Sequence, residues 1–442
     1  EKVRSVTADG QGQYRIVSLR PGLYTVTFTL PGFNTVKRDG VALTTGFTAN
    51  IAVELKVSAL EETITVSCET PVVDIQSSRQ QTTLARATLD ALPTSGRISQ
   101  YANIIPGAVL GVAANQSVGG LDERANNFGI HGARSTDNAP VQDGMVQRLQ
   151  GGAVFVFNNL TFQEVVVETS GMTAERNTGG VQMNIVPKDG GNIFSGSFST
   201  SHSGPSLQSD NLTDDLRARG LKVAPPAVKK HYDTGGALGG PIKRDTLWFF
   251  AAFRGAANQQ YQQGNYFNKL QDTRVGTDKA WRVLFYEPDL DRPAYTDDYY
   301  RDYSLRTTWQ AAAKHKFVAS FQVQPNCSCF WPLLEPQAGV GGTPLAAPEA
   351  VGRHNYKSNF MPIVTWTNPA TNRLLLEAGW SANIFDNDTR RQEGVGTDTI
   401  AITELSQNLR YGSRALALTH AGGYRPQHNR QYHGRFSASY IS

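Results

Sequence analysis

The chain has 442 residues, which suggests about three domains at roughly 150 residues each. Its 42 glycines and 21 prolines, with only 18% charged residues, favour a β-rich, turn-rich protein and argue against a coiled coil or disorder. The net charge is only +4 and the arginines are scattered, which argues against nucleic-acid binding. The longest apolar run is Leu247–Phe253, whereas a spanning helix needs about twenty residues, so no transmembrane helix is predicted.

Residues 1–56 are predicted to form a small all-β unit, a transthyretin-like or immunoglobulin-like sandwich. After a glycine-containing turn, Tyr14–Val17 is a short predicted strand. Leu23–Leu30 is a stronger strand, which a Pro-Gly turn ends, and Ala49–Leu55 closes the set.

Residues 57–70 are predicted to be a mobile, exposed polar connector, in which Glu62–Val66 alternates like a strand. The alternative is an ordinary linker strand packed on the N-terminal sandwich. Residues 71–190 are predicted to form a mixed α/β domain. Within it, Thr83–Leu92 is a candidate short helix and Gln163–Glu168 a candidate strand.

From about residue 192, apolar and polar residues alternate with a period of two. Such alternation over about ten residues is typical of a tilted membrane-spanning strand. We therefore predict that residues 191–442 form the N-terminal part of an antiparallel transmembrane β-barrel. The predicted strands lie at about 192–202, 230–240, 246–256, 302–312, 316–324, 358–367, 373–384 and 429–442.

The connections between these strands alternate between long and short. The short ones are Pro241–Asp245, Ala313–His315 and Asn368–Asn372. Outer-membrane barrels alternate short periplasmic turns with long extracellular loops in this way. A soluble β-sandwich, the alternative fold, has no reason to do so.

The N-terminal unit resembles a known domain family. Leu19–Val26, followed by Pro31–Phe33, is similar to the carboxypeptidase regulatory-like domain, although the first strand of that domain is missing here. The resemblance implies a transthyretin-like fold, found as an N-terminal extension on some outer-membrane receptors.

Four further segments resemble TonB-dependent outer-membrane receptors, in particular the Oar-like group that carries a regulatory-like domain. Glu62–Val66 resembles a TonB box, and Ile130–Arg134 with Val141–Met145 resembles the plug core. Glu175–Asn192 resembles the exit from the plug into the barrel, and Leu238–Phe250 the first periplasmic hairpin.

The resemblance implies site residues. The TonB box comprises Glu62, Thr63, Ile64, Thr65 and Val66, and the structural plug motif comprises Gly132, Arg134, Asp143, Gly144, Gly179 and Gly180. We expect Asp143-Gly144 to form a turn, and the glycine pairs at 179–180 and 190–191 to permit positive φ or close backbone approach. His131 stands where the family usually has Arg, so an ion pair of that Arg is not carried over.

No catalytic motif is found. The regulatory-like domain lacks a His-x-x-Glu zinc pair, and the chain has no Gly-x-Ser-x-Gly elbow. Gly394-Val-Gly396 lacks the third glycine of a dinucleotide loop. His315, His354 and His420 are predicted to be isolated in surface loops. We therefore expect no enzymatic activity, no cofactor and no metal.

The resemblance implies energy-coupled uptake of an unidentified scarce or bulky solute across the outer membrane of a Gram-negative-type bacterium, with the N-terminal domains in the periplasm. The implied partners are TonB with its inner-membrane energising complex, an extracellular ligand and outer-membrane lipid. Tyr295, Tyr299, Tyr300 and Tyr303 leave a glycan or peptide ligand open. The alternative is a structural or adhesive outer-membrane protein that displays its loops without transport.

Two structural expectations follow. Plugged receptors use about 22 strands, and a closed barrel of about eight is filled by its own side chains, so residues 192–442 should form an open, curved sheet that the chain leaves incomplete. Cys327 and Cys329 are expected in an extracellular loop, in a compartment that permits disulfides. A bridge between them, a pair of free thiols and a metal site all remain open, with Cys68 distant in the connector.

Overall fold

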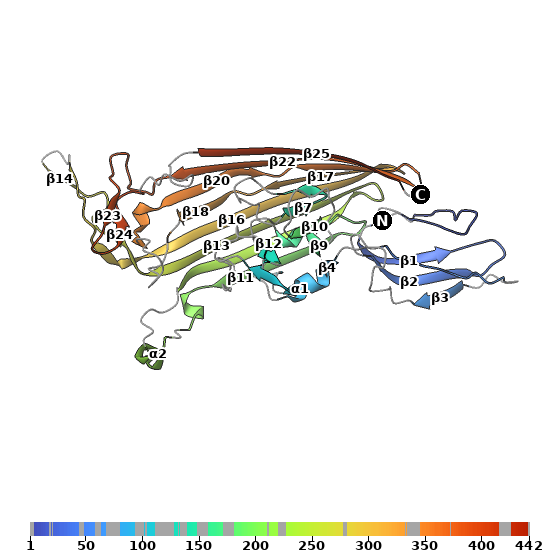
Figure 1. The fold of residues 1–442 in the computed structure, drawn as a ribbon, viewed down its shortest axis with the longest axis horizontal. Helices are drawn as coiled ribbons and strands as arrows, with labels where there is room; N and C mark the ends of the chain where they lie inside the picture. Colours follow the sequence, from blue (N-terminus) through green and yellow to red (C-terminus); the bar gives the residue numbers. More distant parts are fainter. Residues whose placement is uncertain are drawn as a thin grey trace.

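A computed structural model of the chain contains a small N-terminal sheet, a plug domain and a large curved sheet (Figure 1). The residues that the structure describes are 4–16, 19, 21–43, 48–57, 63–67, 80–92, 101, 104–110, 128–130, 132, 139–147, 158–170, 181–209, 212–219, 227–276, 281–331, 333, 345–371, 373–414 and 426–440. Within these ranges, no helix combines the length and apolar character needed to cross a membrane.

The N-terminal sheet has three strands. β1 (Gly22–Phe28) pairs antiparallel with β2 (Thr35–Leu43), and β3 (Thr63–Ser67) lies parallel to β2 on its other side. The alternation of Thr and Val in β1 and β2 suits a sheet with one covered face, and Val36 and Val41 are buried.

Two strands predicted in this unit are wrong, because residues 14–16 and 49–55 are not in strands. These segments contact the rest of the unit through side chains instead. The Tyr14 hydroxyl donates to the Ile51 carbonyl at 2.8 Å, and the Tyr14 ring packs edge-on against Phe28 at 5.3 Å between centroids. The ring and hydroxyl of Tyr14 thus hold these segments in place, where backbone hydrogen bonds between strands were predicted.

The plug domain is built on a five-stranded sheet with strand order β4-β9-β10-β7-β8. Its strands are β4 (Gln80–Ala85), β7 (Ala139–Gln142), β8 (Met145–Val146), β9 (Phe162–Ser170) and β10 (Gln182–Pro187). Its core comprises Leu84, Leu89, Tyr101, Ile105, Ile130, Phe162, Val165, Val167, Val181, Met183 and Ile185. The valine-rich run of β9 is buried on both faces, which suits a central strand.

A short helix and a strand pair complete the plug. Helix α1 (Arg86–Ala91) begins three residues later than predicted, because Thr83–Ala85 pairs with β9 as part of β4. β5 (Ala108–Leu110) pairs with β6 (Phe128–Ile130). The predicted strand at Gln163–Glu168 is confirmed inside β9.

The large sheet contains ten strands and is antiparallel throughout. They are β11 (Ser195–Ser203), β12 (Val228–Lys243), β13 (Leu247–Asn268), β16 (Pro288–Ala312), β17 (His315–Val323), β18 (Asn326–Trp331), β20 (Gly352–Phe360), β21 (Ile363–Pro369), β22 (Leu374–Arg390) and β25 (Pro426–Tyr440). β17 and β18 both pair with β16, and β20 and β21 both pair with β22, so the ten strands fill eight places in the sheet. β18, with Cys327 and Cys329, lies in the segment predicted to be a loop between 324 and 358, so that prediction is wrong there, because this segment pairs with β16 and β20.

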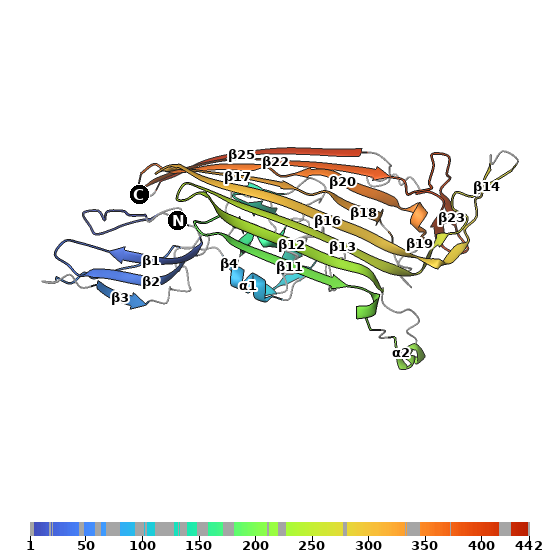
Figure 2. The same ribbon diagram turned by 180° about the vertical axis from the view of Figure 1, so that it is seen from behind.

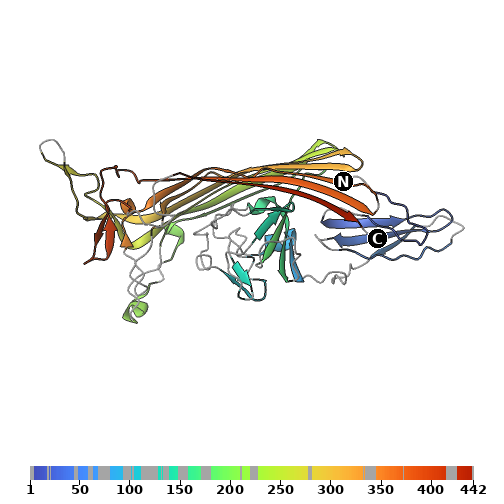
Figure 3. The same cartoon turned by 45° about the horizontal axis from the view of Figure 1, so that its top comes forward.

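The large sheet is open and curved. Within the described residues, its outer strands β11 and β25 do not pair with each other. Figure 3 shows the sheet arching over the plug domain, which lies on its concave side. The predicted open, curved arrangement of this part of the chain is therefore confirmed.

The two faces of the sheet differ in chemistry. The convex face exposes large apolar side chains such as Phe253, Leu305, Trp309, Trp380 and Phe436. The concave face buries polar ones, including Arg254, Asp302, Arg306, Gln322 and Asn383. A lipid-facing outer surface and a polar inner surface are what a transmembrane barrel wall requires.

The two ends of the sheet differ in their connections. The short turns join β12 to β13, β16 to β17 and β21 to β22 at the end nearest the N-terminal sheet (Figures 1 and 2). The opposite end carries helix α2 (Asp214–Ala218), the strand pair β14 (Arg274–Val275) and β15 (Trp281–Arg282), and a small sheet of β19 (Leu345–Ala346), β24 (Leu409–Tyr411) and β23 (Ile402–Glu404).

We call residues 345–351 and 400–412 of that small sheet the loop unit. Its core is Ala347, Leu409 and Tyr411, with Tyr286, Leu345 and Ile402 packed against them. Short turns mark the periplasmic end of an outer-membrane barrel, so the loop unit lies at the extracellular end.

The histidine predictions need a correction. His354 is buried on β20 and not in a surface loop, because it faces the concave side and contacts Asn387 at 3.4 Å and Arg414 at 3.3 Å. His315 is exposed but begins β17, where it stacks on Trp366. His420 lies outside the described residues.

Candidate plug–barrel interface

One arginine of the large sheet holds two acidic residues of the plug. Arg306 on β16 faces the concave side and donates two hydrogen bonds to the Asp143 carboxylate, at 2.6 and 2.9 Å. Its Nε donates to Asp189 Oδ1 at 2.6 Å, and the Thr308 hydroxyl donates to the same oxygen at 2.7 Å. The three charged side chains are each only 10–13% exposed. A bidentate, desolvated contact of this kind is both strong and geometrically specific.

A tight turn aims Asp143 at this arginine. Asp143 and Gly144 are the two residues between β7 and β8, with φ of 52° and 78°. Positive φ at both positions is the requirement of a type I′ hairpin turn, which favours Asp-Gly. The turn predicted at these residues is confirmed. A Cβ added at Gly144 would overlap Arg435 Nη1 on β25, so the turn also fits closely against the barrel wall.

The second acid, Asp189, lies where the plug chain enters the large sheet. A Cβ added at the next residue, Gly190, would come within 2.2 Å of the Phe249 carbonyl oxygen and 2.8 Å of that of Gly240. The close backbone approach predicted for Gly190 is therefore confirmed, whereas Gly191 has open space around it. Only glycine at 190 lets the exit segment lie this close to β12 and β13.

An apolar contact lies beside this ionic one. Met145, next to the turn, is buried against Met361, Ile363 and Phe385 of the large sheet. The Asn383 side-chain amide donates to the Val146 carbonyl at 3.2 Å. The β7–β8 hairpin thus contacts the barrel wall by charge, by apolar packing and through its backbone.

A third contact between the plug and the large sheet involves a fully buried aspartate, Asp302. Asp302 on β16 accepts from Asn158 of the plug segment at 2.9 Å, from Ser304 at 2.6 Å and from Gln324 at 2.9 Å. Gln322 donates to the same carboxylate. Several donors around a buried carboxylate replace the water that it loses.

Among the described residues, no group of three or more His, Cys, Asp or Glu side chains is arranged to hold a metal ion. The arrangement can fix the plug to the large sheet through specific, reversible ion pairs and hydrogen bonds.

Sequence reasoning identified Asp143 and Gly144 but missed Arg306, Asp189 and Asp302. The signal for Arg306 was available, because it falls on the polar side of an alternating strand at 302–312. Its partners are 163 and 117 residues away, and no local pattern indicates such pairs. Gly132 lies in a turn with φ of 80°, whereas Arg134, Gly179 and Gly180 fall outside the described residues.

The predicted TonB box lies in the N-terminal sheet. Thr63, Ile64, Thr65 and Val66 belong to β3, paired in register with Thr35, Val36, Lys37 and Arg38 of β2. Glu62 lies outside the described residues. The segment predicted to be an exposed connector therefore has a strand partner within its own chain.

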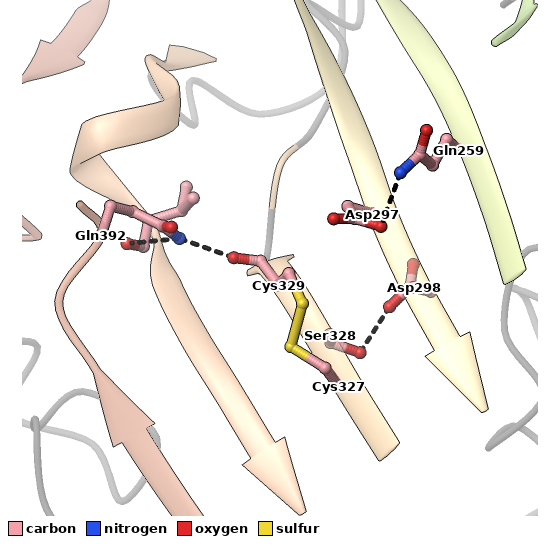
Figure 4. Close-up of a disulfide and its surroundings, with 8 residues drawn as sticks. Gln259, Asp297, Asp298, Cys327, Ser328, Cys329 and Gln392 are labelled. Atoms are coloured by element: carbon pink, nitrogen blue, oxygen red, sulfur yellow. Dashed lines mark hydrogen bonds between the residues drawn. A yellow bond between two sulfur atoms is a disulfide. The ribbon is translucent and has the colours of Figure 1, made fainter. Parts of the chain in front are cut away.

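The cysteine pair at the extracellular end forms a disulfide. Cys327 and Cys329 on β18 are bridged, with their Cα atoms 5.3 Å apart, and both are buried (Figure 4). Of the three alternatives left open by the sequence, the bridge is the one found. Gln392 donates to the Cys329 carbonyl at 2.7 Å, and Ser328 donates to Asp298, so the bridged segment is tied to β16 and to the segment that follows β22. Cys68 lies outside the described residues.

Comparison with known proteins supports this architecture. Residues 1–56 match the carboxypeptidase regulatory-like domain family. The chain is 28% identical to the TonB-dependent transporter Oar of Myxococcus xanthus over 357 residues, which cover 77% of this chain and 32% of that protein.

Among solved structures, the outer-membrane transporter YddB from Escherichia coli is similar, with a TM-score of 0.51 and 13% identity, covering 81% of this chain and 45% of YddB. The ferric enterobactin receptor PfeA from Pseudomonas aeruginosa gives a TM-score of 0.48 at 12% identity, covering 81% of this chain and 46% of that receptor.

These comparisons confirm the predicted fold class, the resemblance to TonB-dependent receptors and the outer-membrane location. The chain spans about a third of the length of Oar and under half that of YddB. The relatives are transporters and receptors, in keeping with the absence of catalytic motifs.

Proposed function

We propose that this chain is part of a receptor that takes up a scarce or bulky solute across the outer membrane, with energy supplied by TonB. The main support for the proposal is the contact of Arg306 with Asp143 and Asp189. This contact fixes the plug domain to the concave face of the large sheet, whose convex face is the one suited to lipid. A structural or adhesive protein that only displays loops has no use for a plug held by breakable polar contacts.

Energy coupling requires a segment that TonB can bind from the periplasm, and β3 is placed to be that segment. It lies in the N-terminal sheet, beyond the short-turn end of the wall (Figures 1 and 2). A strand such as β3 can add to the edge of a partner sheet, with backbone hydrogen bonds giving affinity. We propose that residues 62–66 pair with the periplasmic domain of TonB in this way.

Pairing with TonB competes with pairing to β2. β3 is an outer strand of its sheet, and we propose that TonB takes the place of β2 on the edge of β3 that faces β2. The backbone groups on that edge cannot serve both partners at once, so TonB binds the fraction of molecules in which β3 has separated from β2. Locking β3 onto β2 should therefore block TonB binding.

A disulfide staple tests the proposal. Thr35 and Thr63 are paired residues of the neighbouring strands β2 and β3. Neighbouring strands lie about 4.8 Å apart, within the Cα–Cα range of disulfides. In the full-length protein carrying Thr35→Cys and Thr63→Cys, we expect oxidation to weaken binding of the purified TonB periplasmic domain at least about tenfold, and reduction to restore it. Surface plasmon resonance measures both states.

Each single cysteine variant is the control and should bind TonB equally with and without reductant. Equal TonB binding by the oxidised and reduced double variant would overturn the proposed replacement of β2 by TonB. Absence of TonB binding in both states would favour the structural or adhesive alternative.

A further inference from the structure

On the convex face of β20, β22 and β25, an apolar band ends abruptly in a group of charged residues. Along β22, the convex positions from Leu374 through Trp380 to Ile384 are apolar, and the next two are Asp386 and Asp388. Eleven residues of a tilted strand rise about 25 Å, the height of the lipid-facing band of an outer-membrane barrel. The charged group therefore begins at the extracellular edge of the membrane.

The charged group, which we call the outer-rim patch, comes from three neighbouring strands. It comprises Arg353 and Lys357 of β20, Asp386, Asp388 and Arg390 of β22, and His428 and Arg430 of β25. Direct cross-strand pairs set its geometry, because Arg353 lies opposite Arg390 and Asp386 lies opposite His428.

Each aspartate of the patch lies between two cationic or potentially cationic groups. Asp386 accepts from His428 Nδ1 and Arg430 Nη1, both at 2.7 Å. Asp388 lies 2.6 Å from Arg390 Nη2 and 3.2 Å from Lys357 Nζ. The aspartates are about three-quarters covered, whereas the cations stay exposed, at 54% for Lys357 and 55% for Arg390.

A β-bulge adds one of these cations. The register between β20 and β22 shifts between Tyr356 and Ser358, so Lys357 is the extra residue of the bulge. A bulge re-aims a side chain that regular alternation would place elsewhere. Here it brings Lys357 to the same face as Asp388, which adds a positive charge to the convex surface.

The patch has more positive than negative charge. Arg353, Lys357, Arg390 and Arg430 give four positive charges against two from the aspartates, which leaves +2 with His428 neutral. Arg353 is exposed and forms no ion pair with any other residue in the described part of the chain. The aspartates hold the cations in place, and the outward sides of the guanidinium groups remain open to a ligand.

We propose that the outer-rim patch binds the phosphate groups of the glycolipid that forms the outer leaflet of the outer membrane. Its height places it level with that headgroup layer. Guanidinium groups bind phosphate oxygens in a bidentate manner, and several spaced cations match a headgroup that carries more than one phosphate. Exposed aromatic residues directly below, such as Tyr432 and Phe436, contact the acyl chains.

Binding of bisphosphorylated lipid A to the full-length, delipidated protein in detergent tests the proposal, with native mass spectrometry as the measurement. The variant carries Arg353→Gln, Arg390→Gln and Arg430→Gln. Each cation near an anionic lipid surface contributes to binding, so the triple variant should bind at least about tenfold more weakly. Dephosphorylated lipid A with the same acyl chains should bind parent and variant equally.

The matched control carries Lys243→Gln, Arg244→Gln and Lys314→Gln, three exposed cations at the short turns of the opposite end. It should bind lipid A like the parent. Equal lipid A binding by the outer-rim variant and the parent would overturn the proposal. So would equal binding of phosphorylated and dephosphorylated lipid A by the parent, or full displacement of lipid A by millimolar inorganic phosphate. A gel-mobility shift on heating confirms that each variant is folded.

Discussion

Buried carboxylates occur in two regions of the molecule, in different surroundings. At the plug–barrel interface, Asp143 and Asp189 share the guanidinium of Arg306. In the extracellular loop unit, Glu349 is only 3% exposed and no ion pair to it is found among the described residues. Burial raises the pKa of the Glu349 carboxyl to about 7.

The comparison shows how the local partner decides what a buried acid does. A carboxylate next to a guanidinium keeps its charge and serves as a fixed link between domains. A buried carboxylate without a neighbouring cation becomes protonated at a higher pH than usual, because burial penalises the ionised form. We therefore expect the loop unit to be sensitive to pH.

The largest effect is expected from removing the shared cation. Arg306→Met would leave two buried carboxylates without their partner, and breaking a buried ion pair costs about 3–5 kcal/mol. We expect the free energy of plug opening to fall by about that amount, as measured by hydrogen exchange of amides in β9 and β10.

The matched control is Arg301→Met, on the same strand but exposed on the convex face, which should leave plug exchange unchanged. Adding Asp143→Asn and Asp189→Asn to Arg306→Met should recover most of the loss, because no uncompensated charge remains. Unchanged exchange in Arg306→Met would mean that the plug is held by the Met145 contact instead.

These two regions also show how far sequence reasoning reaches. The period-two alternation predicted the strands and their faces because lipid on one side and polar surroundings on the other impose that pattern locally. The Asp143-Gly144 turn was predictable because positive φ restricts residue choice. The partners of Arg306 and the burial of Glu349 were not predictable, since they depend on segments brought together only by the complete fold.

A pH change should affect the stability of the loop unit. The pKa of Glu349 is raised from 4.5 to about 7 in the folded protein, so its stabilising effect is complete below about pH 4.5 and is lost as the pH rises through 7. From pH 5 to pH 8, we expect the opening free energy of residues 400–412 to fall by about 3 kcal/mol. Hydrogen exchange, corrected for the intrinsic rate at each pH, measures it.

Glu349→Gln should remove this pH dependence, since glutamine cannot ionise. Glu404→Gln is the matched control, because Glu404 is on β23 of the same unit but does not share the buried surroundings. If the loop unit opens equally readily at pH 5 and pH 8, burial does not raise the pKa of Glu349, and the contrast with Asp143 and Asp189 disappears.

The smallest effect is expected where a carboxylate has a partner but remains in contact with water. Asp39 on β2 accepts from the Thr25 hydroxyl at 2.6 Å and lies 3.4 Å from Lys37 Nζ, with 37% of its side chain exposed. The hydrogen bond from Thr25, with the charge of Lys37, lowers the pKa of Asp39.

A lowered pKa in the folded state has the opposite sign to that of Glu349. The stabilising effect of Asp39 is present above its unfolded pKa of about 3.8 and is lost as the pH falls through the folded value. Asp39→Asn should therefore speed hydrogen exchange of β1 and β2 amides slightly at pH 7, and the difference from the parent should shrink as the pH falls below the unfolded pKa. Solvent screening keeps the effect well below that of Arg306→Met.

The control is Glu54→Gln, which changes another exposed carboxylate in the same domain and should have no effect at neutral or at low pH. An Asp39→Asn effect as large as that of Arg306→Met would show that exposure to water does not separate the two kinds of acid in this protein.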